Sequence, residues 1–266
     1  EFLLFANLDA NKIENIEIYS PGNDILTFEK INDKSGDGYL WKIKNINYFA
    51  DKNIVDNLIK TIQELKSSET VSSNANNLSK YGLDDINATN VKLKNGEDVI
   101  AELLIGSKGF GFNSQFVRLP DQNKVYLISS NLEDQFKKQI DDFRDKTIVN
   151  KEATEIQKVL ISGIEIKDEG VKDKFAPFNA NGFIDAGENT DEAETQPTEA
   201  FDIQIFIKDI TEPITVKIGK ITKSDNYLVT IDTVPGQMFT VSKYLIDEFY
   251  KYLQDAKAQE IVTAPV

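Results

Sequence analysis

The oxygen-rich stretch PFNANGFIDAGE, residues 177–188, comes nearest in residue type and spacing to a metal-binding site. Aligned with a twelve-residue calcium loop, it places oxygen-bearing side chains at positions 3, 5, 9 and 12 and a glycine at the sharp turn of position 6. Position 1 is Pro177, and no helical pattern flanks the stretch, so a solvated acidic loop is the competing interpretation. The candidate ligands are Asn179, Asn181, Asp185 and Glu188.

Catalytic chemistry has little support in the remaining residues. Histidine and cysteine are absent from all 266 residues, which excludes a Ser-His triad, a thiol nucleophile, a disulfide and the usual structural zinc sites. Carboxylate pairs such as Asp141 and Asp142 are adjacent in the chain and do not converge from opposite walls of a cleft, as acid–base pairs must. We therefore expect no enzymatic activity and no cofactor, with calcium as the one candidate ligand.

The glycine-rich stretch IGSKGFGFN contains Gly106, Gly109 and Gly111. A phosphate-binding loop requires a helix after the glycines, because the helix N-terminus faces the anion. Here the glycines precede QFVRL, which has the pattern of a strand. The stretch therefore predicts a hairpin loop, in which Gly106 has a structural or partner-contact role.

The chain has two arginines and one tryptophan. Arg144 lies among carboxylates in DDFRDK, where it could bind a partner's carboxylate or form an internal ion pair. We favour the internal ion pair and expect a similar role for Arg118 on its strand. Trp41 follows a turn signal and is expected to anchor the core. Partner contact is the alternative for all three side chains.

Composition and charge narrow the class of protein. Apolar residues make up 40% of the chain, which is typical of a globular protein. The net charge is -14, so nucleic acids and anionic lipid surfaces are not expected partners. No apolar run approaches the ~18 residues of a membrane helix, so any membrane anchor would have to precede residue 1.

Two segments, 113 positions apart, follow one pattern. Residues 125–138 and 238–251 are identical at five of fourteen positions. The match extends back to Gly106 and Gly219, each of which ends a run of alternating apolar residues. The identical pairs are Ser129/Ser242, Leu132/Leu245, Asp134/Asp247, Phe136/Phe249 and Lys138/Lys251.

Each copy is expected to contain four short strands followed by one helix. Short strands with short connections favour antiparallel pairing, with the helix on one face. In the first copy, Ser130 and Glu133 form a capping-box pattern, and Leu132, Phe136 and Ile140 recur at helical spacing. The predicted fold class is α+β, built from duplicated modules of an antiparallel β-meander followed by a helix on one face.

The first third of the chain follows the same order more loosely. Turn signals separate three predicted strands, and Asp51 then precedes a helix with an apolar stripe from Ile54 to Leu65. The small polar residues at 67–80 are expected to connect these elements and not to pack.

A domain boundary is expected near Asn150. Residues 1–150 would form a first pair of meander–helix modules. Residues 151–256 would form a second, partly degenerate module with an acidic loop at 168–200, and 257–266 a tail. The loop prediction depends on charge, since residues 175–200 contain six acidic residues and no basic residue.

Short motifs in a characteristic order make residues 3 to about 167 resemble the domain-of-unknown-function family 4340: GYLWKI, YGLDD, LLIG, FVRL, VYLI and DFRDKTIV. The resemblance implies an extracytoplasmic protein, tethered to the cytoplasmic membrane by an N-terminal helix absent from this chain. It also implies a gene beside gliding-motility-type ABC transporters, whose permease or associated membrane subunits are the expected partners. After residue 168 the chain departs from the family pattern.

The resemblance implies no reaction. The first hypothesis is therefore a non-catalytic accessory or scaffold subunit of a gliding-type ABC transport or motility assembly, acting through protein–protein contacts. The alternative is a free-standing surface or periplasmic protein that binds a ligand, with calcium as the candidate. Both hypotheses place the chain outside the cytoplasm.

Overall fold

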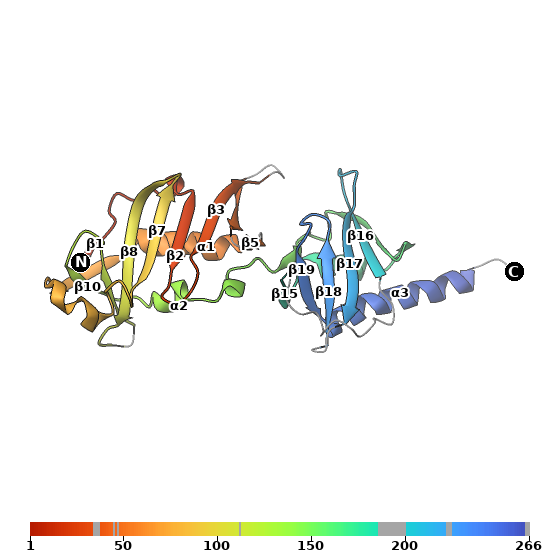
Figure 1. Cartoon of the computed structure of the whole chain (residues 1–266). Coiled ribbons are helices and arrows are strands. Elements are labelled where there is room, and N and C mark those ends of the chain that lie inside the picture. The colour runs from red at the N-terminus through yellow and green to blue at the C-terminus, as the bar shows by residue number, and fades with distance from the viewer. Residues whose placement is uncertain are drawn as a thin grey trace. The chain divides into compact units, whose positions relative to one another are not determined.

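The computed structural model describes residues 1–263 except 34–37, 45, 47, 112, 186–200 and 222–224 (Figure 1). The chain divides into two compact units, Glu1–Asp145 and Lys146–Val266, called unit 1 and unit 2 below. The division falls shortly before Asn150, because strand β11 (Thr147–Val149) pairs with β14 (Phe178–Asn179) inside unit 2. Antiparallel sheets with a few helices make up both units, which confirms the α+β class.

Unit 1 is built on a ten-stranded antiparallel sheet. Its strands are β1 (Phe2–Leu3), β2 (Asn15–Tyr19), β3 (Leu26–Asn32), β4 (Tyr39–Ile43), β5 (Tyr48–Ala50), β6 (Lys66–Ser72), β7 (Thr89–Asn95), β8 (Asp98–Lys108), β9 (Gln115–Arg118) and β10 (Val125–Ile128). They lie in the order β1-β6-β10-β9-β8-β7-β2-β3-β4-β5. Two meanders, β2 to β5 and β7 to β10, therefore meet where β2 pairs with β7.

One face of this sheet is covered by helix α1 (Lys52–Gln63), which lies behind the strands in Figure 1. Asp51 caps the helix as predicted, because its carboxylate accepts the backbone amides of Asn53 and Ile54. Alternation in the strands matches this cover: Ile16 and Ile18 of β2 are buried in the core under α1. The helix buries Val55, Leu58, Ile59 and Ile62.

Unit 2 contains a seven-stranded antiparallel sheet. Its strands are β12 (Ile156–Ile161), β13 (Ile164–Glu165), β15 (Gly182–Ile184), β16 (Phe201–Ile207), β17 (Ile214–Ile221), β18 (Asn226–Ile231) and β19 (Met238–Ser242), in the order β13-β12-β16-β17-β18-β19-β15. Helix α3 (Lys243–Thr263) and the 3₁₀ helix η4 (Glu169–Phe175) supply the cover, through Ile246, Phe249 and Phe175. None of the helices in the described residues is long and apolar enough to cross a membrane.

The two sheets share one order of strands. In unit 1 it runs β3-β2-β7-β8-β9-β10-β6, and in unit 2 it runs β13-β12-β16-β17-β18-β19-β15. Every neighbouring pair in both series is antiparallel. In each unit the chain also forms the elements in the same sequence: a hairpin, an edge or near-edge strand, a four-stranded meander and a helix.

The helix predicted after β10 is much shorter than its apolar spacing indicated. Helix α2 covers only Glu133–Phe136, and a separate 3₁₀ helix, η3, follows at Ile140–Asp142. The break occurs because Gln139 is extended and its backbone amide is bound by the Asp142 carboxylate at 3.1 Å. The predicted capping box of Ser130 and Glu133 is also wrong, since the N-cap position is Leu132 and has no side-chain cap.

Two segments predicted to be connecting loops are largely regular structure. Residues 67–80 contain most of β6 and of the 3₁₀ helix η2 (Ala75–Tyr81), because β6 fills the space between β1 and β10 and buries Ser67. The predicted acidic loop at 168–200 contains η4, β14 and β15. Residues 186–200 of this predicted loop lie outside the described part of the chain.

Candidate functional site

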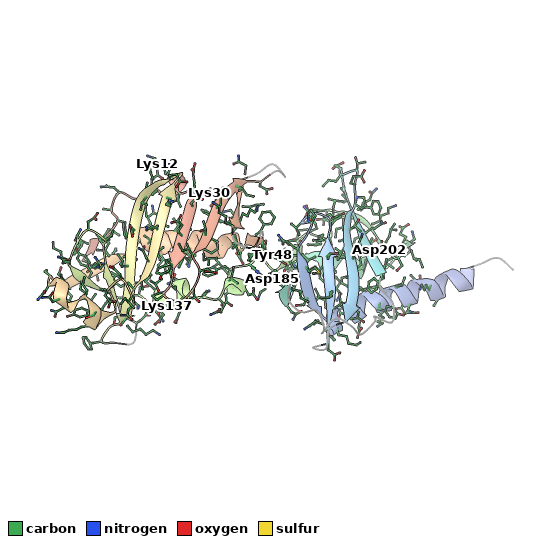
Figure 2. All side chains as sticks on the ribbon, in the orientation of Figure 1. Lys12, Lys30, Tyr48, Lys137, Asp185 and Asp202 are labelled. Carbon is green, nitrogen blue, oxygen red and sulfur yellow. The ribbon has the colours of Figure 1, made fainter. Side chains whose placement is uncertain are left out.

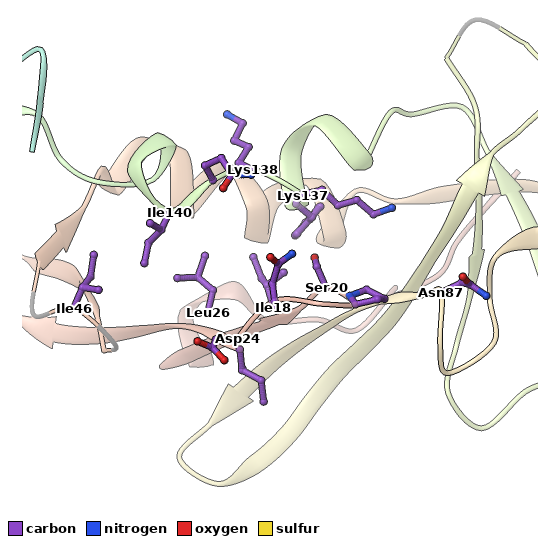
Figure 3. Close-up of a pocket in the computed structure, with 14 residues that line it drawn as sticks. Ile18, Ser20, Asp24, Leu26, Ile46, Asn87, Lys137, Lys138 and Ile140 are labelled. Carbon is purple, nitrogen blue, oxygen red and sulfur yellow. The ribbon is translucent and has the colours of Figure 1, made fainter. Parts of the chain in front are cut away.

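A cavity of about 640 Å³ lies in unit 1, between the sheet and the segment that joins α2 to η3 (Figure 3). Five separate parts of the chain line it: the end of β2, the β2–β3 turn with the start of β3, the β4–β5 loop, Asn87 shortly before β7, and the α2–η3 segment. The lining residues are Ile18, Ser20, Pro21, Asn23, Asp24, Ile25, Leu26, Ile46, Asn87, Phe136, Lys137, Lys138, Gln139 and Ile140.

Part of the cavity wall is apolar. Ile18 and Phe136 are buried, with 3% and 1% of their surface exposed, and both belong to the core under α1. Leu26, Ile46 and Ile140 are partly buried and pack against the same core, and Figure 3 shows them facing one another across one end of the cavity. This part of the wall therefore continues the core of unit 1 and can contact an apolar group.

The rim of the cavity is polar. Ser20 points its hydroxyl toward the α2–η3 segment in Figure 3 and lies 3.4 Å from the hydroxyl of Thr89. Lys137 stands on that segment and forms an ion pair with Glu133 at 3.1 Å. Lys138 points outward beside it, and Asp24 lies on the opposite wall. A cavity with apolar side chains at one end and polar groups around its mouth can bind an organic molecule.

Trp41, a predicted core anchor, is fully buried on β4 and belongs to a polar network with α1. The Asp56 carboxylate accepts hydrogen bonds from Trp41 Nε1 at 2.8 Å, from the Tyr39 hydroxyl at 2.9 Å and from Lys52 Nζ at 2.5 Å. Burial raises the pKa of Asp56, but the hydrogen bonds from Lys52, Trp41 and Tyr39 outweigh it and leave the pKa below its usual value. This network ties the helix to the sheet.

Lys30 lies beside the two aromatic residues of this network (Figure 2). Its ammonium lies 4.3 Å from the centre of the Tyr39 ring and 5.2 Å from that of Trp41. Burial lowers the pKa of Lys30, and attraction to Asp56 offsets only part of that effect. The arrangement is a packed cation–π cluster.

Arg144 forms the internal ion pair that the sequence favoured. Its Nη1 lies 3.2 Å from Asp141 Oδ1, and its guanidinium lies 4.3 Å from the ring centre of Tyr48. The backbone of Arg144 also bridges to Ala50, next to the edge of the sheet. Arg118 acts differently from the prediction, because its Nη1 donates to the carbonyls of Pro120 and Gln122 and so holds the turn after β9.

The glycine-rich stretch is the hairpin loop between β8 and β9, as predicted. The Gly109 amide donates to the Ser114 carbonyl at 2.9 Å. At Gly106, an added Cβ would lie 2.2 Å from the Tyr81 carbonyl oxygen, so only glycine allows the chain after η2 to pass so close to β8. The structure thus gives Gly106 a packing role.

The described candidate calcium ligands form a strand–turn–strand unit. Asn179 lies in β14, and the Oδ1 atom of Asn181 accepts the Ser242 backbone amide at 2.7 Å. Asp185 follows β15, whereas Glu188 lies outside the described residues. Within the described ranges, no group of three or more acidic side chains is placed to hold a metal ion.

Sequence reasoning did not find the cavity or the Asp56 network. The cavity combines the β2–β3 turn with residues 136–140, which lie far apart in the chain, so no local motif marks it. Asp56 carried a signal, because it interrupts the apolar stripe of α1 one turn after Lys52. A carboxylate at such a position indicates a polar partner on the element that the helix covers.

Fold and site together define a two-unit α+β protein of antiparallel sheets, with an open cavity in unit 1. The chain belongs to the family described as a domain of unknown function (DUF4340), which matches residues 41–205. This match confirms the resemblance seen in the sequence motifs. No curated protein matches the chain, and no solved structure matches it.

Proposed function

We propose that the chain is a non-catalytic accessory or scaffold subunit of a gliding-type ABC transport or motility assembly. It would act on the extracytoplasmic side of the cytoplasmic membrane, tethered there, and would bind permease or associated membrane subunits. The family to which the chain belongs supports this proposal through the gene neighbourhood that the resemblance implies. Support from a family is an analogy. The physical argument for binding a protein partner rests instead on a surface of the chain that suits such a partner.

The observation that carries the proposal is the open face of the unit 1 sheet, meaning the face opposite α1 around β2 and β7, beyond the area over Leu104 and Phe116 that η2 covers. In Figure 1, β2, β7 and β8 lie in front with α1 behind them, so their outward side chains are not covered by that helix. These side chains form a charged lattice: Lys94 Nζ lies 3.0 Å from Glu17, and Lys92 Nζ lies 3.9 Å from Glu102. A broad sheet face with fixed charges of both signs suits a protein surface of complementary pattern.

We further propose that the two units derive from one duplicated module. The shared strand order supports this, because it holds across seven strands in each sheet. The 113-residue offset of the sequence supports it independently, since it carries the first residue of β10, Val125, onto the first residue of β19, Met238. A duplicated platform gives the protein two similar sheet faces, which suits a scaffold.

Affinity purification of the tethered protein from its native membranes in mild detergent, with mass spectrometry, tests the function. We expect transporter subunits in stoichiometric amount with the wild type. The double variant Lys92→Glu and Lys94→Glu reverses the charges of the open face and should release them. Lys60→Glu, an exposed charge reversal on α1, should retain them. Recovery of the wild type alone would contradict the scaffold function and favour a free-standing ligand-binding protein.

A further inference from the structure

The cavity in unit 1 is not a requirement of the fold. The 113-residue offset pairs Phe136, which lines the cavity, with Phe249 of unit 2. Both phenylalanines follow the last strand of a meander, and both are buried. The same position in the same strand order can therefore be compared between the units.

In unit 2 this position is filled by aromatic rings. Phe249 stacks on Phe175 of η4 with ring centres 5.4 Å apart, and meets Phe178 of β14 edge-on at 5.5 Å. All three side chains are fully buried. In unit 2 the space beside this phenylalanine is occupied by η4 and β14, whereas in the described part of unit 1 an open cavity lies beside Phe136.

We propose that the unit 1 cavity is a binding site for a small amphipathic organic anion. The apolar body of the ligand would lie between Ile18 and Leu26 on the sheet and Ile140 on the α2–η3 segment. The volume of the cavity, about 640 Å³, lies within the range of about 300–1,000 Å³ that is usual for small-molecule sites. This site goes beyond the proposed scaffold function, because it lies among the side chains that face α1 and not on the open face of the sheet.

The charges around the cavity decide the class of ligand. The chain as a whole carries a net charge of -14, so most of its surface repels anions. The cavity rim carries Lys137, which is already paired with Glu133, Lys138, and the carboxylate of Asp24. Lys138 is therefore the cation that the rim offers to an anionic group. Both lysines stand on the α2–η3 segment, whereas Asp24 lies on the opposite wall (Figure 3). An anionic head group is therefore best placed at the lysine side of the mouth, with hydrogen bonds available from Ser20.

Fluorescence titration of the full chain with anilinonaphthalene sulfonate, an aromatic anion that brightens in apolar surroundings, tests the proposal. We expect saturable binding at one site per chain. Leu26→Phe places an aromatic ring in the slot, as Phe175 does in unit 2, and should weaken binding at least about tenfold. Lys138→Glu should weaken it by roughly threefold to tenfold, while Lys138→Arg should retain it.

Lys60→Glu is the matched control, because it makes the same charge change on an exposed part of α1, away from the cavity. Trp41 fluorescence and far-UV circular dichroism show whether each variant remains folded. If Leu26→Phe does not remain folded, the lysine variants alone test the proposal. Absence of saturable binding to the wild type would overturn the proposal. Equal affinity of wild type, Lys138→Glu and Lys60→Glu would overturn it as well.

Discussion

Units 1 and 2 differ in how they cover one face of a similar sheet. Unit 1 extends its first hairpin with β4 and β5 and then lays α1 over the core. The described part of unit 2 contains no counterpart of those strands, and its cover comes from η4 and the first half of α3, through Phe175, Phe249 and Leu253. The face is buried in both, because an antiparallel sheet with one apolar face requires a cover, but the covering elements are exchangeable.

The difference in cover changes the packing around the phenylalanine that follows the last strand of each meander. Unit 2 packs Phe249 between two other rings, whereas unit 1 leaves a cavity beside Phe136. A scaffold that only had to fold could have filled both positions. Some residues therefore hold the fold that both units share, and others make unit 1 different.

The largest expected effect on stability follows from removing the Phe249 ring. Phe249→Ala should lower the free energy of unfolding by about 3–5 kcal/mol, because it removes a buried ring and leaves a cavity among Phe175 and Phe178. Phe136→Ala should cost less, about 2–3 kcal/mol, since the space it leaves opens into an existing cavity. Urea unfolding followed by far-UV circular dichroism measures both. Equal losses of unfolding free energy would show that Phe136 and Phe249 are packed alike.

The two glycines that the offset pairs should respond differently to alanine. At Gly106 the new Cβ would lie 2.2 Å from a backbone oxygen, so we expect a loss of about 2–3 kcal/mol. At Gly219 the nearest atom, the Leu228 carbonyl oxygen, lies 3.3 Å away, so the loss should stay below about 1 kcal/mol. Thermal unfolding of both variants checks this, and a larger loss at Gly219 would refute the packing role given to Gly106.

The stability of unit 1 should depend on pH in the acid range because of Asp56. Its pKa is lower in the folded state than in the unfolded chain, so its stabilising contribution is complete at neutral pH. The contribution is lost as the pH falls below the usual aspartate range and through the depressed pKa. Asp56→Asn should cost about 1–2 kcal/mol at pH 7 and flatten this acid dependence.

Urea unfolding monitored by Trp41 across this pH range measures the effect, since Trp41 is the only tryptophan and reports on unit 1. Asp121→Asn, an exposed carboxylate outside the network, is the comparison variant. An acid dependence that survives in Asp56→Asn would remove the network as its source.

The smallest effect belongs to the ion pair that joins η4 to α3 in unit 2. Lys174 Nζ lies 2.9 Å from Glu248, and this hydrogen bond raises the pKa of Lys174. Both side chains remain about 30% exposed, so Glu248→Gln should cost no more than about 0.5 kcal/mol. Differential scanning calorimetry can resolve a change of this size. A loss comparable to that of Asp56→Asn would mean that η4 depends on this pair more than on Phe175.

Local signals in the sequence predicted part of this fold. Asp51 was predicted as a cap because its side chain acts on the next residues, and the β8–β9 hairpin was predicted because glycines separate two alternating runs. Strand β6 was missed because its pattern is polar, and its place depends on β1 and β10, which are distant in the chain. The short α2 was missed because a side-chain contact, Asp142 with the Gln139 amide, competes with apolar periodicity.

The candidate sites divide along the same line. Trp41, Gly106 and Arg144 stand out by residue type, and each makes close local or core contacts. The cavity residues do not stand out, because isoleucine, serine and lysine are common and only the fold brings them together. The calcium pattern depended on spacing alone, and the strands β14 and β15 occupy its described part.

The central structural claim is that each unit holds a complete core of its own, on a shared plan. Urea unfolding of the full chain, compared with residues 1–145 and 146–266 expressed separately, tests it most directly. We expect each fragment to unfold cooperatively, with the Trp41 transition of the full chain reproduced by the first fragment alone. If neither fragment folds, and the Trp41 and circular dichroism transitions of the full chain coincide, the two units form one cooperative structure and the comparison between them fails.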